Sequence, residues 1–302
     1  MNILREIILP ISTPFSGRIE IEPQELGANL TKWRDDFRLG FVALGSTGER
    51  VHLNERECLD VIETARECVP DNKAFIVGAG QQSTRVTIEE AKRYAQAGAD
   101  ALLIITPYFY KSAITQDALY KYYMAVADAS PVPVILYSMP ALTGIAIAPE
   151  TVARLSEHPN IIGLKDSSDD MPNLSKTIQL VSDDFAVLTG NGPSLYAALC
   201  AGAKGGILAV GCVAPRLCIE IYDAFHAGEH EKAQELQRKL TPLAKAVTVK
   251  YGIGGLKAAM DLVGLYGGPV RAPLEDASDE AKQEIARLLE EAGVIGDNVA
   301  SG

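Results

Sequence analysis

The chain has 302 residues, of which 47% are hydrophobic, so it can bury a full core as one large barrel or as two domains. Lysine and arginine total 28 against 39 aspartates and glutamates, and the net charge of -11 disfavours binding to nucleic acid or an anionic membrane surface. This charge still permits a local basic pocket for a small anion. No segment reaches the roughly 18 uninterrupted apolar residues of a membrane span.

The cysteines and histidines indicate neither a disulfide framework nor a metal site. Five cysteines lack a CxxC pair, and their odd number favours a reducing compartment. Four histidines form no HExxH motif, so no metal is expected. Because the N-terminus has no cationic region followed by a long apolar stretch, we expect a cytoplasmic protein. A transit peptide that had already been removed would leave no trace in this sequence.

Apolar runs alternate with helix-like segments along the first 220 residues. Eight runs predict buried strands, at residues 7–11, 41–44, 74–77, 101–105, 132–136, 161–164, 186–188 and 206–210. Helical periodicity and capping residues predict helices at 22–37, 54–68, 84–96, 115–128, 148–156, 171–181 and 194–199. Eight strand–helix units of this length predict an α/β fold, a (β/α)8 TIM barrel, with an open doubly wound sheet as the alternative.

The last part of the chain predicts helices without strands. Helical segments at 219–227, 231–250, 255–263 and 278–292 predict a C-terminal helical extension. We therefore expect a barrel domain at 1–225 and a helical domain at 226–302, packed directly together because no Gly/Ser-rich linker separates them. Glycine-rich stretches at 251–255 and 266–269 predict turns rather than a dinucleotide site. Residues 296–302 are expected to fray.

Lys165 and Tyr137 are the strongest candidates for chemistry. Each follows an apolar run, and one β/α repeat separates them, so a barrel would place them on adjacent strands facing the same mouth. A strand-end lysine can simply extend into solvent. A buried lysine instead loses hydration of its charged form, which favours the free amine that attacks a carbonyl carbon. A phenol beside that amine can move protons while a Schiff base forms.

A turn after the second apolar run offers a site for a carboxylate. Residues 45–48 carry the hydroxyls of Ser46 and Thr47 together with a row of backbone N–H groups. The same turn could be an ordinary loop that caps a helix. Another polar loop, at 190–192, follows the seventh run and would face the same mouth.

Motifs in order along the chain resemble one family of enzymes. The segments 10–15, 45–49, 106–108, 137–144, 163–167 and 255–257 are similar to the pyruvate-dependent class I aldolases and lyases grouped around dihydrodipicolinate synthase and N-acetylneuraminate lyase. The resemblance implies that Lys165 forms a Schiff base with the keto carbon of pyruvate and that Tyr137 moves protons. It implies substrate-binding roles for Ser46, Thr47, Ser167, Gly190, Asn191 and Ile207.

The same resemblance carries more detailed expectations. Ser46 and Thr47 would hold the pyruvate carboxylate, Ile207 would offer a backbone contact, and Gly190 and Asn191 would lie near the rest of the substrate. The family is typically a homotetramer, a dimer of dimers, and needs neither a metal nor an organic cofactor. Segments 136–138, 158–161, 165–167 and 264–269 most resemble the 4-hydroxy-2-oxoglutarate aldolase branch.

Two residues depart from the family pattern. Leu142 stands where dihydrodipicolinate synthases carry an arginine that binds the carboxylate of aspartate semialdehyde, and a leucine cannot make that contact. N-acetylneuraminate lyases can also have leucine there, but Asp166 and residues 191–193 do not resemble their sugar-binding motifs. Phe109 stands where many members place a tyrosine that reaches into the neighbouring subunit's site, and it lacks the hydroxyl.

We therefore expect a Schiff-base aldolase that cleaves or forms a 4-hydroxy-2-oxo acid from pyruvate and an aldehyde. The alternatives are a 4-hydroxy-tetrahydrodipicolinate synthase and an aldolase or dehydratase of 2-keto-3-deoxy sugar acids. A catalytically silent 2-oxo-acid-binding protein is the alternative from another class, and Phe109 is its only support in the sequence.

Overall fold

A computed structural model of the chain describes residues 4–17, 19–36 and 40–296. Across these residues, parallel strands follow one another around a closed barrel in chain order, and the last strand pairs with the first. The strands are β1 (Glu6–Pro10), β2 (Phe41–Ala43), β3 (Phe75–Ala79), β4 (Ala101–Ile105), β5 (Val134–Ser138), β6 (Ile161–Asp166), β7 (Ala186–Thr189) and β8 (Gly205–Ile207). The predicted TIM barrel is confirmed, and the open sheet is wrong.

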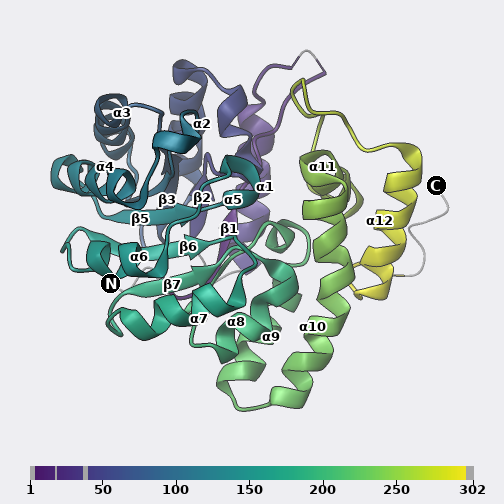
Figure 1. The fold of residues 1–302 in the computed structure, drawn as a ribbon. Coiled ribbons are helices and arrows are strands. Elements are labelled where there is room, and N and C mark those ends of the chain that lie inside the picture. The colour runs from purple at the N-terminus through teal and green to yellow at the C-terminus, as the bar shows by residue number, and fades with distance from the viewer. Residues whose placement is uncertain (1–3, 18, 37–39, 297–302) are drawn as a thin grey trace.

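Helices surround the strands, and the final helices pack beside them (Figure 1). The barrel helices are α1 (Pro23–Asp36), α2 (Glu55–Cys68), α3 (Thr84–Gln96), α4 (Gln116–Ala129), α5 (Pro140–Thr143), α6 (Pro149–Ser156), α7 (Met171–Leu180), α8 (Leu195–Cys200) and α9 (Pro215–His226). The extension comprises α10 (His230–Lys245), which continues as a π-helix over Ala246–Lys250, α11 (Gly252–Leu262) and α12 (Asp279–Glu291). Because α9 packs against both β1 and α10, the extension continues the outer layer of the barrel.

The strands are mostly apolar, with polar residues confined to their ends, because both of their faces are buried. Along β4, Leu103 points into the barrel, where it packs with Ile135 of β5. Its neighbours Leu102 and Ile104 belong to the separate core between the strands and the helices. Side chains alternate between these two cores with the period of two that a strand imposes.

The predicted strand ends differ from the observed ends around the barrel mouth. β5 and β6 continue past their apolar runs, so that Tyr137 and Lys165 lie within strands rather than after them. Backbone pairing continues there, with Tyr137 opposite Lys165, because the hydrogen-bond ladder does not require apolar side chains. The run at 206–210 was predicted too long: β8 ends at Ile207, and a 3-10 helix follows over Ala209–Cys212.

The glycine-rich stretch at 251–255 is not a turn, contrary to the prediction. Gly254 and Gly255 lie in the first turn of α11. A Cβ added at Gly254 would lie 2.4 Å from the backbone oxygen of Glu275, so glycine serves close packing of the extension on itself. The stretch at 266–269, for which a turn was also predicted, lies in the connection between α11 and α12.

Two further expectations concern the chain ends. The division at residue 225 falls within one residue of the end of α9, and the two-domain description stays a prediction. In the predicted frayed tail, residues 297–302 lie outside the described residues.

Replacing Gly78 with alanine should destabilise the barrel, because the added Cβ would lie 2.2 Å from the backbone oxygen of Leu44. Gly78 lies in β3, where the backbone of β4 at Leu103 and the backbone of Leu44 on the other side leave little room to relax. We expect Gly78→Ala to lower the free energy of unfolding by roughly 1–3 kcal/mol or more. Urea unfolding followed by circular dichroism measures this change.

Gly17→Ala is the matched control, since no heavy atom lies within 4 Å of its added Cβ. It should shift the free energy of unfolding by no more than about 0.5 kcal/mol. Equal urea midpoints for the two variants would contradict the packing argument.

Candidate active site

Tyr137 and Lys165 form the centre of the candidate site. They are register partners on β5 and β6, so their side chains emerge from the same face of the sheet. Lys165 Nζ lies 4.3 Å from the centroid of the Tyr137 ring. The two residues are only 5% and 4% exposed. The barrel thus holds an amine against the face of a phenol ring, away from bulk solvent.

Ser46 extends this pair across the barrel. It begins a 3-10 helix over Ser46–Gly48, directly after β2, and its Oγ lies 3.1 Å from Tyr137 Oη. The turn is short and internally bonded, because Gly48 N donates to Gly45 O at 3.0 Å. Thr47 is buried in the same turn. The Ser46 hydroxyl therefore contacts the Tyr137 phenol, and the Lys165 amine lies against the ring of that phenol, so groups that can carry a proton lie close together.

Gly190 and Ser167 lie beside the lysine. A Cβ added at Gly190 would lie 1.8 Å from Ser167 Oγ and 3.2 Å from Lys165 Cε, so a larger residue would displace Ser167 beside the lysine. Gly190 N also donates to Asp166 O at 2.6 Å, which joins the loop after β7 to the end of β6. Ile207 lies in β8 and packs in the same inner core as Tyr137.

Asn191 lies farther out, among polar loop residues. Its Nδ2 is 3.5 Å from Asp169 Oδ1, which also accepts a hydrogen bond from Ser194 Oγ at 3.1 Å. Asp169 has a φ of 59°, in the left-handed region that few non-glycine residues adopt. The structure therefore brings Asn191 to the rim of the site, and Asp169 is a rim residue that the sequence did not single out.

Asp166 follows the lysine but faces a different environment. Burial raises the pKa of Asp166, and hydrogen bonds from Ser168 oppose that shift. Ser168 N donates to Asp166 Oδ1 at 2.7 Å. Because successive side chains of a strand point to opposite faces, Asp166 supports the strand end rather than sharing the inner face with Lys165.

Phe109 and Leu142 project from the structure instead of packing into it. Phe109 is 71% exposed, and its ring packs edge to face on Tyr110 at 5.0 Å between centroids. Its backbone is held by Gln82 Oε1, which accepts from Phe109 N at 2.8 Å. Leu142, on α5, is 62% exposed. Both side chains are thus available to groups outside this chain.

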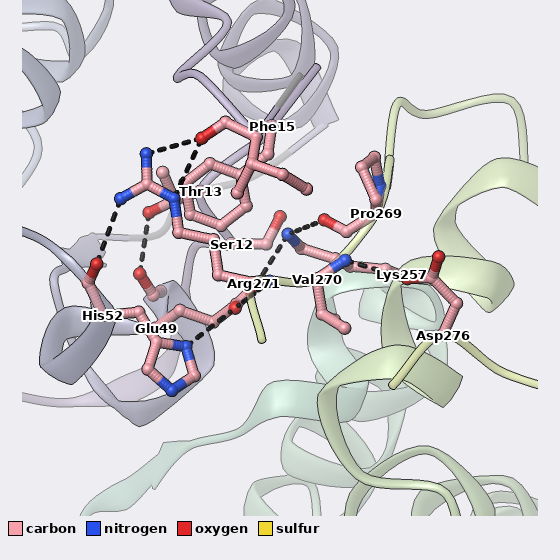
Figure 2. A network of polar contacts seen from close by, with 12 residues as sticks. Ser12, Thr13, Phe15, Glu49, His52, Lys257, Pro269, Val270, Arg271 and Asp276 are labelled. Atoms are coloured by element: carbon pink, nitrogen blue, oxygen red, sulfur yellow. Dashed lines mark hydrogen bonds and ion pairs between the residues drawn. The ribbon is translucent and has the colours of Figure 1, made fainter. Parts of the chain in front are cut away.

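A buried ion pair borders the Ser46–Gly48 turn, and sequence reasoning assigned it no role. Figure 2 shows Lys257 between Glu49 and Pro269, with Lys257 Nζ 2.7 Å from Glu49 Oε1. Both side chains are 1% exposed. The available signal was that Glu49 and Lys257 each end a segment that carries the family resemblance, at 45–49 and 255–257.

Two kinds of feature are absent from the residues that the structure describes. In that part of the chain, no group of three or more His, Cys, Asp or Glu side chains could hold a metal ion. Among the helices at 4–17, 19–36 and 40–296, none is long and apolar enough to cross a bilayer.

Comparisons with known proteins cover nearly the whole chain. The model of the dihydrodipicolinate synthetase family matches residues 3–292. The 4-hydroxy-tetrahydrodipicolinate synthase of Thermodesulfovibrio yellowstonii is 36% identical over 290 residues, which are 95% of this chain and 98% of the relative.

Solved structures of the same family superpose closely. A dihydrodipicolinate synthase from Thermotoga maritima is 31% identical, with a TM-score of 0.92 over 97% of this chain and 100% of the other. A chloride-inhibited dihydrodipicolinate synthase from Acinetobacter baumannii, complexed with pyruvate, is 30% identical, with a TM-score of 0.91 over 97% and 100% of the two chains. The chain belongs to the dihydrodipicolinate synthetase family and is an enzyme, because the members of this family are class I Schiff-base lyases and aldolases.

Proposed function

We propose that the enzyme is an aldolase that joins or separates pyruvate and an aldehyde through an imine on Lys165. The observation that carries the proposal is the placement of Lys165 Nζ against the Tyr137 ring, with Tyr137 Oη 3.1 Å from Ser46 Oγ. A buried amine next to a chain of hydroxyl groups has the parts that imine chemistry requires.

The reaction requires only these residues, the substrate and water. The Lys165 amine attacks the keto carbon of a 4-hydroxy-2-oxo acid to give a carbinolamine, which loses water to become a protonated imine. The imine draws electrons as the C3–C4 bond breaks, while the 4-hydroxyl gives up its proton and an aldehyde leaves. The enamine that remains is protonated at C3, and hydrolysis releases pyruvate and the free amine. Tyr137 moves the protons of these steps.

The surrounding residues hold the substrate. Ser46 and Thr47 bind the carboxylate next to the reacting carbon, which turns an encounter into a positioned reaction. Ser167 and Gly190 line the lysine, Ile207 offers a backbone contact, and Asn191 meets the distal part of the substrate at the rim. The Acinetobacter baumannii relative, which is complexed with pyruvate, supports pyruvate as the 2-oxo acid that binds here. The steps need neither a metal nor an organic cofactor.

The aldehyde half of the substrate is assigned from Leu142. A leucine offers no hydrogen bonds to the carboxylate of aspartate semialdehyde, which favours a 4-hydroxy-2-oxo acid aldolase, of the 4-hydroxy-2-oxoglutarate type, over a synthase. The name of the Thermodesulfovibrio yellowstonii relative supports 4-hydroxy-tetrahydrodipicolinate synthase as the second candidate. An aldolase or dehydratase of 2-keto-3-deoxy sugar acids uses the same imine. A silent 2-oxo-acid binder would have no chemical need for the Lys165–Tyr137 pair.

The proposal also covers the oligomeric state and the cellular location of the enzyme. The exposed Phe109 side chain supports assembly of the chain into the homotetramer typical of the family. The cysteine usage supports a cytoplasmic enzyme.

Borohydride reduction in the presence of pyruvate should add the reduced pyruvate mass to Lys165, because reduction traps the imine as a stable amine. Intact-protein and peptide mass spectrometry measure the mass and its position. Lys165→Arg should abolish trapping and turnover without unfolding, because arginine keeps the charge but offers no free amine.

Lys176→Arg is the control, since Lys176 pairs with Glu150 on the exposed surface and should leave trapping unchanged. Folded protein whose Lys165 stays unmodified at saturating pyruvate would contradict the proposed mechanism.

Tyr137→Phe should lower kcat by about 10²- to 10⁴-fold, because it removes the proton-moving hydroxyl and keeps the ring beside the lysine. Trapping by borohydride should persist at a reduced rate. Tyr122→Phe is the matched control, because Tyr122 is a buried tyrosine of α4 whose hydroxyl contacts Thr87, away from the site. Steady-state kinetics on both variants provides the comparison, and equal losses of kcat would remove Tyr137 from the mechanism.

A substrate comparison should separate the candidate reactions. We expect pyruvate release from 4-hydroxy-2-oxoglutarate to exceed, in kcat/KM, both pyruvate consumption with aspartate semialdehyde and turnover of a 2-keto-3-deoxy sugar acid. The reason is that Leu142, unlike an arginine at this position, cannot bind the carboxylate of aspartate semialdehyde. Higher kcat/KM with aspartate semialdehyde would assign the synthase activity instead, and pyruvate binding without any turnover would favour the silent binder.

A further inference from the structure

Glu49 ties the carboxylate-binding turn to the C-terminal extension. Its backbone N donates to Ser46 O at 3.2 Å, and its φ of 53° turns the chain sharply at the end of the 3-10 helix. Its carboxylate receives three partners: Lys257 Nζ at 2.7 Å, Arg271 N at 3.0 Å and His52 Nδ1 at 3.2 Å. Moving the Glu49 carboxylate would therefore move Ser46 with it.

Lys257 is itself held on the extension side. It lies on α11, and its Nζ also donates to Pro269 O at 2.8 Å. The same Nζ lies 4.3 Å from the ring centroid of Phe15, and the guanidinium carbon of Arg271 lies 4.4 Å from that centroid. The buried Phe15 ring thus contacts two cations of the extension.

A second link runs from the same segment to the turn. Phe15 lies two residues after Thr13, whose Oγ1 donates to Gly48 O at 2.8 Å. Figure 2 shows Thr13, Glu49 and Lys257 within one network of polar contacts, and all three side chains are buried. Two polar contacts, through Thr13 and through Glu49, therefore hold the end of the Ser46–Gly48 turn.

The energetics of the pair point to a role in geometry. Burial lowers the pKa of Lys257, and the charge of Glu49 opposes that shift. Desolvation of two buried ions offsets much of their attraction, so such a pair contributes little net stability compared with apolar residues. Once one partner is present, however, the other is strongly held, because an unpaired buried charge is costly.

We propose that Lys257 is a positioning residue for substrate: through Glu49, it holds the Ser46–Thr47 turn in the orientation that receives the carboxylate of the 2-oxo acid. This inference rests on the proposed function, in which that turn binds the carboxylate. Lys257 touches no substrate itself. The C-terminal extension is, on this basis, part of the substrate-recognition machinery rather than only a cover for the barrel.

A comparison of two ketones distinguishes positioning of the carboxylate-binding turn from a purely structural role of Lys257. Pyruvate and acetone both present a methyl ketone to the amine of Lys165, but only pyruvate carries a carboxylate. Disturbing the turn should therefore slow imine formation more with pyruvate than with acetone, because only pyruvate loses a carboxylate contact. General loosening of the barrel would slow both equally.

The test compares Lys257→Met with wild-type protein by borohydride trapping at equal, subsaturating concentrations of pyruvate or acetone. We expect the ratio of the initial trapping rates, pyruvate over acetone, to fall about tenfold, the equivalent of about 1.4 kcal/mol. Lys250→Met is the matched control, because Lys250 is an exposed lysine of the extension paired with Glu284 at 2.6 Å. Its rate ratio should match wild type. An unchanged ratio in Lys257→Met, or an equal slowing with both ketones, would overturn the proposal.

Lys257→Met leaves Glu49 buried without its cation and can fail to fold, so the double variant Glu49→Gln/Lys257→Met provides a second measurement. Removing both charges relieves the unpaired ion. We expect this variant to fold, by circular dichroism, and to keep the low rate ratio, because the tether to α11 is missing. A wild-type ratio in the folded double variant would show that the pair supplies only stability. Failure of the wild-type enzyme to trap pyruvate at Lys165 would instead contradict the proposed function.

Discussion

Closure of the parallel ladder is the constraint on which this structure depends. β8 pairs with β7 on one side and with β1 on the other, so every strand presents its C-terminal end to one mouth. Closure demands close backbone contact, since a Cβ at Gly205 would lie 1.9 Å from Glu6 O. The same ladder places Tyr137 opposite Lys165 on neighbouring strands. The register between β5 and β6 thus sets the distance between the amine and the phenol, and loops alone would not fix that distance.

The other residues of the site lie mostly on loops, and different contacts hold each loop in place. The Ser46–Gly48 turn is held by its own backbone bonds, by Thr13 and by Glu49. In the loop after β7, Gly190 packs closely against Ser167, which occupies the space that a side chain at position 190 would need. Leu142 and Phe109 remain exposed, which suits positions that differ among enzymes sharing one imine chemistry.

Most of the barrel could be predicted from sequence because strand identity is a local property. Burial on both faces makes each strand a continuous apolar run, and turns and helix caps mark its ends. The prediction lost accuracy where local pattern and backbone pairing diverge. β6 continues through the polar Lys165 and Asp166, whereas the apolar residues Leu208 to Val210 leave the sheet. The sequence predicts a turn around Gly254 because the close contact that favours glycine there, with Glu275, comes from a distant part of the chain.

The sequence by itself determined the family resemblance, the barrel, and the pairing of Lys165 with Tyr137 on adjacent strands, since these follow from periodicity, spacing and motif order. Only the tertiary structure decided that Tyr137 Oη reaches Ser46 and that Glu49 is buried between Lys257 and Arg271. Glu49 and Arg271 are separated by 222 residues. No local pattern records such a contact, because the desolvation that gives the ion pair its effect exists only once the extension has folded onto the barrel.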